Sequence, residues 1–549
     1  MNVLSSIADC YCRKKRQIAS ETLTFRPANA ILFKIFKGAE KMNNKSRYDW
    51  TITLVPFVLI SMMCVMFFAE PESSNRVVSS IRGFLGDSFG VYYLALGLGM
   101  VIVSLYIAFS RYGTIVLGEQ TEKPKYSFFI WGSMMFTAGI AADILFYSLC
   151  EWILYADDPH IKELGSIQDW ASTYTLFHWG PIPWSFYMVL AIAFGFMLHV
   201  RKRSRQKYSE ACRPLLGKHT DGAAGRMIDL LAIFALLAGT ATTFSIATPL
   251  MAEAIKTICG ISLSDRVITI LILLITCVIY TYSVMKGMWG VSLLAKSCTY
   301  LFYALLFFVL FFGGETKYIL ETGFSAMGRL AQNFLTMATY TDPERKTGFA
   351  QNWTIFYWAY WMVWCVAAPF FIGMISRGRT IRQTILGGYL FGIGSTFVSF
   401  IILGNYSLGL QVLGRFDVLA LYHKSQDLYT TIISIIQTLP FAKAVLILLI
   451  LTMITFYATS FDSIALVASQ YTYKNLGEDE EPKGIVKAFW SVILILLPVA
   501  LVFSESSMAN LQSVSIIAAF PIGIVIILIT ASFLKDAGSF LKEQKEAQD

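Results

Sequence analysis

The chain has 549 residues, of which 56% are hydrophobic and only 15% are charged, and its formal net charge is +8. Soluble domains carry roughly a quarter charged residues, so this composition excludes an ordinary soluble protein. The 42 Phe, 27 Tyr and 12 Trp exclude intrinsic disorder. Basic residues are spread between apolar runs, which argues against a nucleic-acid partner, and the nine cysteines show no metal-ligand or disulfide spacing.

Apolar runs long enough to cross a bilayer recur along the whole chain. A bilayer core takes roughly 20 apolar residues as a helix, so the sequence predicts an all-α integral membrane protein with about twelve transmembrane helices. The predicted spans are 50–68, 90–109, 128–153, 174–200, 227–255, 266–285, 292–313, 352–376, 383–409, 443–471, 486–504 and 513–534. Two stretches of mixed composition, 318–342 and 425–439, are typical of helices that lie at the membrane surface.

Lysine and arginine residues set the predicted orientation. They gather in the segments on the same side as the N-terminus, above all between residues 201 and 207, directly after the fourth span. By the positive-inside rule, both termini are predicted to be cytoplasmic. Residues 1–41 hold a basic run but no long apolar stretch, and Met42 follows them. They are interpreted as a start-site artefact or a disordered tail, with a regulatory tail that touches anionic lipid as the less favoured alternative, and not as a signal peptide.

Four acidic residues fall within predicted spans, where an ionised side chain is expensive, namely Asp143, Glu151, Glu253 and Asp462. Glu151 and Glu253 lie near span ends, where a structural role explains them at least as well as a ligand role. Asp143 lies near the middle of the third span, after the small residues of a GIAA stretch. Small residues permit local unwinding, which lipid tolerates only around a cavity, so Asp143 is a candidate site residue.

Two hydroxyl groups enter the tenth span at Thr459 and Ser460, in a segment rich in Leu and Ile. Hydroxyl and carbonyl oxygens are the ligands that a hard cation such as sodium prefers. The alternative is that both hydroxyls bond back to carbonyls of their own helix, and spacing alone favours this alternative.

Tryptophan and tyrosine residues are concentrated in the fourth and eighth spans. In the eighth span, spacing at 100° per residue brings four aromatic residues to one helix face over about two turns. These are Tyr357, Tyr360, Trp361 and Trp364, and the aromatic residues of the fourth span are Trp179, Trp184 and Tyr187. An interfacial aromatic belt is the alternative reading, although the face in the eighth span runs further inward than a belt requires.

A face of aromatic rings suits a cation that offers no N–H donor. A methylated ammonium hydrates weakly and gains roughly 0.5–2 kcal/mol from each ring face that it meets in a dry site. The pattern therefore favours a site for a quaternary ammonium compound.

Four stretches of the chain carry a resemblance to a known family: YTLFHWGPIPWSFY, NWTIFYWAYWMVW, ISRGRTIR and RYGTIVLGEQTEKPKYS. From the first span onward the chain resembles the betaine/carnitine/choline transporters, and FHWGPIPW, CEW, IATPL and YTDPERKTGFAQNWT look most like the carnitine/γ-butyrobetaine antiporter branch. The resemblance implies a LeuT-type core in which spans three to seven and eight to twelve form two inverted repeats. It also implies two peripheral N-terminal helices, a homotrimer in membrane lipid, and the bacterial inner membrane as the location.

The implied organisation divides the chain into six parts. These are a cytoplasmic tail at 1–48, two peripheral helices at 49–112, a first repeat at 113–313, an amphipathic periplasmic-side helix and loop at 314–351, a second repeat at 352–534, and a cytoplasmic tail at 535–549.

The resemblance also assigns site residues. The aromatic box of the family falls on Trp179, Trp184, Tyr187 and Trp361, and Tyr360 and Trp364 match further aromatic positions of the substrate site. Here the chain departs from the pattern, since Tyr360 stands where Trp is usual and Trp364 stands where the carnitine branch has Tyr. The sodium ligands of sodium-coupled members fall on Thr137, Ile140, Phe456, Thr459 and Ser460.

The coupling ion stays open between sodium, a proton and exchange. The sodium-independent carnitine antiporter replaces sodium with an arginine in the seventh span. At the matching place this chain has Ala295 with Lys296 beside it. A buried Asp143 also makes proton coupling a candidate, because burial favours the protonated carboxyl. No cofactor is expected.

Asp143 falls on the last glycine of the GMGIG motif of betaine carriers, where choline-carrying members of the family have Asp. A carboxylate near the ammonium attracts a net cation and repels the carboxylate of a zwitterion. The sequence thus predicts secondary transport of a quaternary ammonium compound, with a choline-like cation slightly favoured. The alternative is an exchanger of carnitine and γ-butyrobetaine or of glycine betaine. A membrane enzyme or a channel is disfavoured, because the five histidines lie far apart and no filter motif occurs.

Overall fold

The computed structural model describes residues 47–140, 142–261, 263–477, 480–503 and 508–547. Most of the tail predicted at 1–48, with the start-site question at 1–41, lies outside these residues. Within them the chain is helical, and the only β-type pairings are two isolated bridges, Tyr48 with Tyr473 and Val116 with Thr380. The all-α prediction is confirmed.

In the described part of the chain, three α-helices precede the first predicted repeat. They are α3 (Trp50–Ala69), α4 (Pro71–Ser88) and α5 (Gly90–Phe109). The bounds of α5 are those of the predicted span. The sequence predicts no span over α4, because this segment is too polar to cross a bilayer.

The next five predicted spans follow as helices of similar bounds, and the first of them is broken. The third span consists of α6 (Phe128–Gly139) and α7 (Asp143–Ala156), which are bent by 60°. A short helix, α8 (Pro159–Leu164), follows α7, and another, α11 (Arg213–Leu216), lies between the fourth and fifth spans. The other spans are α9 (Ile167–His178) with α10 (Pro181–Gly195) and its π-helical end at Phe196–Val200, α12 (Ala223–Cys259), α13 (Asp265–Met285) and α14 (Met288–Phe312).

The last five predicted spans repeat this order. The eighth span begins with η6 (Ala350–Thr354) and continues as α16 (Ile355–Trp364) and α17 (Ala368–Ile375), with a bend of 51°. The ninth runs from α18 (Ile381–Gly388) through α19 (Gly394–Ser399) to α20 (Asn405–Val412). The others are α23 (Ala442–Tyr471), α24 (Gly484–Phe503) and α25 (Met508–Glu546).

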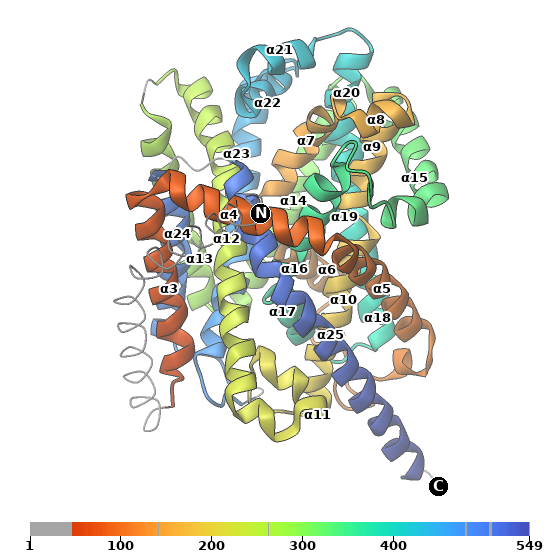
Figure 1. Ribbon diagram of the computed structural model, residues 1–549, viewed down its shortest axis with the longest axis vertical. Coiled ribbons are helices and arrows are strands. Elements are labelled where there is room, and N and C mark those ends of the chain that lie inside the picture. The colour runs from red at the N-terminus through yellow and green to blue at the C-terminus, as the bar shows by residue number, and fades with distance from the viewer. Residues whose placement is uncertain (1–46, 141, 262, 478–479, 504–507, 548–549) are drawn as a thin grey trace, which may run out of the picture.

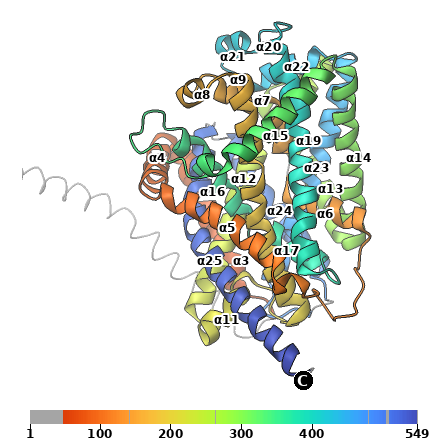
Figure 2. The ribbon, with the colours of Figure 1, turned by 90° about the vertical axis from the view of Figure 1, so that its right-hand side faces the viewer.

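The broken helices stand at the same place in both groups, since each is the first of five. In the predicted inverted repeat, such discontinuous helices of the two halves would face each other around a site, and the repeat stays a prediction. The long helices run roughly along the long axis of the molecule, with α21 (Val418–Ser425) and α22 (Leu428–Gln437) at one end (Figure 1). Helix α15 (Thr316–Ala338) crosses the outside of the bundle obliquely (Figure 2).

The protein is a multi-pass membrane protein by the length and composition of its helices. Eight described helices are long and apolar enough to cross a membrane, and the two bent pairs raise this number to ten. In α3 and α24 the apolar stretches found among the described residues are shorter, Trp50–Leu59 and Gly484–Leu496. The full count of twelve therefore stays a prediction.

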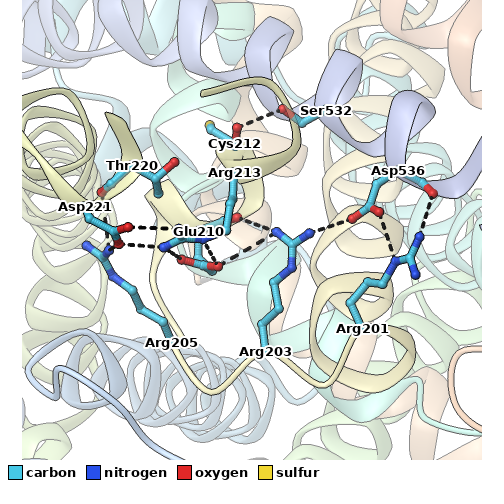
Figure 3. Close-up of polar contacts among 10 residues, drawn as sticks. All are labelled: Arg201, Arg203, Arg205, Glu210, Cys212, Arg213, Thr220, Asp221, Ser532 and Asp536. Carbon is cyan, nitrogen blue, oxygen red and sulfur yellow. Dashed lines mark hydrogen bonds and ion pairs between the residues drawn. The ribbon is translucent and has the colours of Figure 1, made fainter. Parts of the chain in front are cut away.

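A cluster of ion pairs joins the segment after α10 to the last helix (Figure 3). Arg201 Nε lies 2.9 Å from Asp536 Oδ1, and Arg203 Nη2 lies 2.7 Å from Asp536 Oδ2. Glu210 and Asp221 continue the cluster through Arg213, at 2.5 and 2.6 Å. These contacts give α25 a partner beyond residue 534, where the sequence predicts a tail, and the helix continues to Glu546.

Candidate functional site

A break between two helices brings Trp179 into the interior. Helix α9 ends at His178, and α10 begins at Pro181 in its first turn, where the missing proline N–H is not needed. Trp179 therefore lies in a non-helical junction and is only 2% exposed. Trp184 and Tyr187, on the first turns of α10, are buried as well.

Trp361 on α16 stands at the centre of the aromatic cluster. Its ring centroid lies 5.5 Å from that of Trp179, 5.9 Å from that of Trp184 and 5.1 Å from that of Tyr187. Trp184 and Tyr187 also contact each other at 5.6 Å. The structure thus brings together the four residues that the resemblance assigns to an aromatic box.

Two glycines allow the helices to approach these rings. A Cβ atom at Gly139, the last residue of α6, would lie 2.9 Å from Trp184 Cη2 and 3.2 Å from Tyr187 Cε2. A Cβ atom at Gly392, in the ninth span, would lie 2.3 Å from Trp184 Cδ2. The two glycines therefore leave room for the indole of Trp184 between the third and ninth spans.

A narrow cavity opens beside the cluster at the break of the third span. Its lining consists of Gly139, Ile140, Asp143, Trp179, Tyr187, Tyr360, Trp361 and Trp364. Trp184 packs behind this lining. The space for water-sized molecules is about 10 Å³, enough for about one water. The rings must separate before a trimethylammonium group can enter.

Asp143 is the acidic residue of this cavity and begins helix α7. It is buried, and the Tyr360 hydroxyl donates a short hydrogen bond to its Oδ2. The Tyr360 oxygen also lies 2.5 Å from Thr243 Oγ1 on α12. The partial positive charge at the helix N-terminus favours a carboxylate at this position. The aromatic cavity therefore carries one acidic group, whose nearest polar partner is a phenol.

One of the predicted sodium ligands, Ser460, contacts two others across the helices. Ser460 Oγ on α23 donates to the carbonyl oxygens of Thr137 and Ile140, both at 3.1 Å. Thr459 Oγ1 donates to the carbonyl oxygen of Phe456 at 2.9 Å. Spacing alone favoured back-bonding within the tenth span. Thr459 follows that alternative, whereas Ser460 reaches across to the end of α6.

Lys296, the basic residue next to Ala295, does not lie at this place. Its side chain is exposed on α14, with its ammonium 5.9 Å from the ring centroid of Tyr300. Ala295 is buried. The structure thus gives Lys296 no part in replacing sodium. Asp462 is buried on the same helix as Ser460 and accepts a hydrogen bond from Ser283 at 2.6 Å.

Two residues near the cluster were not assigned to the site from the sequence. The ring of Tyr147, one turn after Asp143, lies 5.7 Å from Trp179 and 5.9 Å from Tyr357. Glu151, one turn further, accepts a hydrogen bond from Trp179 Nε1 at 2.7 Å. The four-residue spacing of Asp143, Tyr147 and Glu151 along one helix face is the signal that could have found them.

Two bent helices at a buried polar cavity in an all-helical bundle are typical of secondary transporters. The sequence matches the family described as BCCT, betaine/carnitine/choline family transporter, over residues 51–540, so the chain belongs to that family. Its members are transporters and not enzymes. Within the described residues, no three His, Cys, Asp or Glu side chains are grouped as metal ligands.

Two curated relatives match over most of the chain. The glycine betaine transporter OpuD of Bacillus subtilis (strain 168) is 32% identical over 487 residues, which cover 87% of this chain and 92% of that protein. A probable glycine betaine transporter of Desulfitobacterium hafniense (strain Y51) is 29% identical over 504 residues, with 91% and 98% covered. A solved structure of a substrate-bound, outward-open Na⁺-coupled sialic acid symporter aligns with a TM-score of 0.45 at 14% identity, covering 81% of this chain and 86% of that chain. The likeness to the carnitine branch stays a prediction.

Proposed function

We propose that this protein carries a quaternary ammonium compound across the bacterial plasma membrane by secondary active transport, and that it favours a choline-like cation. The observation that supports this proposal is the cavity in which Trp179, Tyr187 and Trp361 meet the carboxyl group of Asp143. The rings supply cation–π attraction to a methylated ammonium, and the carboxylate adds a full negative charge.

Exchange of a zwitterion is the second candidate, and the contact between Tyr360 and Asp143 favours it. A carboxylate that already accepts a phenol hydrogen bond attracts a substrate ammonium less strongly and repels a substrate carboxylate less strongly. The two relatives, a glycine betaine transporter and a probable glycine betaine transporter, also favour a zwitterion. Carnitine, γ-butyrobetaine and glycine betaine are the zwitterions to compare with choline.

Counterflow in proteoliposomes tests the class of activity. Vesicles that contain the purified protein and unlabelled choline should take up labelled choline several times faster than vesicles without internal choline. This acceleration arises because a carrier returns faster with substrate bound. The same assay with glycine betaine or carnitine inside the vesicles compares the exchange of these zwitterions with that of choline. Equal uptake with and without an internal substrate, for all of these compounds, would argue against a carrier.

For the coupling ion we propose sodium, which would bind between the end of α6 and the middle of α23. The carbonyl oxygens of Thr137, Ile140 and Phe456 and the hydroxyls of Thr459 and Ser460 are the oxygen ligands that sodium prefers. Hydrogen bonds join Ser460 to Thr137 and Ile140 across the two helices, and Thr459 to Phe456 within α23. A proton is the alternative, and Asp143 would carry it.

Replacing Ser460 with alanine should raise the sodium concentration for half-maximal uptake about tenfold or more, because it removes one of the few oxygen ligands. Uptake is measured across a sodium series, with potassium or lithium as replacement. Ser463→Ala is the matched control, since the Ser463 hydroxyl donates to carbonyls of its own helix, those of Thr459 and Ser460. Full uptake without sodium in the native protein would remove Ser460 as an ion ligand.

We further propose that the protein forms a homotrimer in the lipid bilayer with both termini cytoplasmic, as its family resemblance implies. Helix α15 offers an apolar surface for contact with two further copies, with Phe324 78% exposed and Leu335 66% exposed. Beside it, Leu310, Val398, Ile401 and Ile402 line an apolar groove.

A further inference from the structure

Glu151 is a buried carboxylate that accepts three hydrogen bonds. Its Oε1 accepts from the Tyr155 hydroxyl, and its Oε2 accepts from Trp179 Nε1 and from the Tyr357 hydroxyl, each at 2.7 Å. The side chain is 0% exposed. An ionised carboxylate only accepts hydrogen bonds, so each of the three donors finds an acceptor.

These contacts join three parts of the chain at one point. Glu151 and Tyr155 belong to α7, Trp179 to the junction of α9 and α10, and Tyr357 to α16. The same three parts carry the cavity. Trp179 contacts the central ring of Trp361 at 5.5 Å, so any rotation of its indole changes the shape of the aromatic cluster.

A histidine extends the network and fixes its direction. His178 Nδ1 lies 2.7 Å from the Tyr155 oxygen, and His178 Nε2 lies 3.1 Å from Thr354 Oγ1. Because the Tyr155 hydroxyl donates to Glu151, Nδ1 must carry the proton that donates to Tyr155, and Nε2 accepts from Thr354. His178 is then neutral. The hydrogen bonds run from Thr354 through His178 and Tyr155 to Oε1 of Glu151.

We propose that Glu151 is a positioning residue for substrate recognition, which fixes the indole of Trp179 in the aromatic cluster and the phenol of Tyr357 beside it. The proposal rests on the proposed function, because the orientation of Trp179 matters only if the cluster binds the substrate. A buried indole N–H has one proton to donate, and its acceptor therefore sets the rotation of the ring. Glu151 acts through Trp179 and does not touch the cavity.

Glutamine at position 151 keeps the size of the side chain but replaces one acceptor oxygen by an NH₂ group. That group would face donors, so at least one of the three hydrogen bonds is lost. Phenylalanine at position 179 keeps a ring but has no N–H to bond. If Glu151 acts through the indole N–H, then its replacement should matter much less once Trp179 has become phenylalanine.

The test is a double-mutant cycle on the full chain in proteoliposomes, with initial rates of labelled choline and glycine betaine uptake. Glu151→Gln should raise KM about tenfold while the maximal rate and the Tm change little. In the Trp179→Phe background the same replacement should raise KM less than about threefold. Glu253→Gln is the matched control, since Glu253 lies near the end of another span and pairs with Lys256 at 3.0 Å.

Two results would overturn the proposal: an unchanged KM in Glu151→Gln, or fully additive effects in the double mutant. If Glu151→Gln does not fold, Glu151→Asp replaces it in the cycle, because it keeps the carboxylate but withdraws it by one methylene. Failure of the proposed function has a different signature. In that case Trp179→Phe would leave KM unchanged, or the native protein would show no saturable uptake of either compound.

Discussion

Trp361→Ala is expected to nearly abolish uptake of quaternary ammonium compounds at substrate concentrations up to the native KM, while the protein still reaches the membrane. Among the residues that the structure describes, Trp361 is the ring that contacts Trp179, Trp184 and Tyr187 together. Its loss removes one cation–π partner and the support of the others, roughly 2–3 kcal/mol, which is about 30–150-fold in affinity. Uptake of labelled substrate at a concentration far below the native KM measures this loss.

The matched control for this change is Trp490→Ala. Trp490 on α24 is also a buried indole, but its Nε1 donates to Thr472 at 2.6 Å and it lies outside the cavity. Trp361→Phe, which keeps a ring, should lie between the native protein and the alanine variant. Normal uptake by Trp361→Ala would show that the ring cluster does not bind the substrate, and equal losses in both alanine variants would indicate a general effect on folding.

Asp143→Gly should reverse the order of preference between choline and the zwitterions. Two unit charges about 5 Å apart at an effective dielectric of about 20 interact by about 3 kcal/mol, so removing the carboxylate should shift the ratio of choline to glycine betaine affinity by roughly 100-fold or more. Competition of unlabelled choline, glycine betaine, carnitine and γ-butyrobetaine against one labelled substrate measures the ratio.

A second variant separates the charge of Asp143 from its size. Asp143→Asn keeps the shape of the side chain and can still accept a hydrogen bond from Tyr360. If the charge sets the preference, then the asparagine variant should shift the ratio in the same direction as the glycine variant. An unchanged ranking in both variants would show that Asp143 does not face the bound substrate.

The helices could be predicted well because the bilayer requires long apolar segments. Helix α5 has the bounds of its predicted span, and most others differ by a few residues. Helix α4 was missed because its sequence is polar, and α25 was predicted too short because Asp536 and Lys535 look like the start of a soluble tail. The ion pairs that hold α25 come from residues 201 and 203, which are far away in sequence.

The site could be predicted in its residue types but not in its contacts. Helical spacing places Tyr357, Tyr360, Trp361 and Trp364 on one face, yet they have different partners. Tyr357 bonds to Glu151, Tyr360 to Asp143, and Trp361 packs on three rings. Partner choice depends on how α7, α10 and α16 cross, and that crossing is set by their bends and by glycines such as Gly139, which a single sequence does not position.

The measurement that tests the account most directly compares choline with its uncharged carbon analogue, 3,3-dimethyl-1-butanol, which has the same shape. Both compounds compete with labelled substrate for the purified native protein. Rings and a carboxylate that recognise a methylated cation should bind choline at least about tenfold more tightly than the neutral analogue. Equal competition by the two compounds would contradict recognition of the quaternary ammonium charge by Trp179, Tyr187, Trp361 and Asp143.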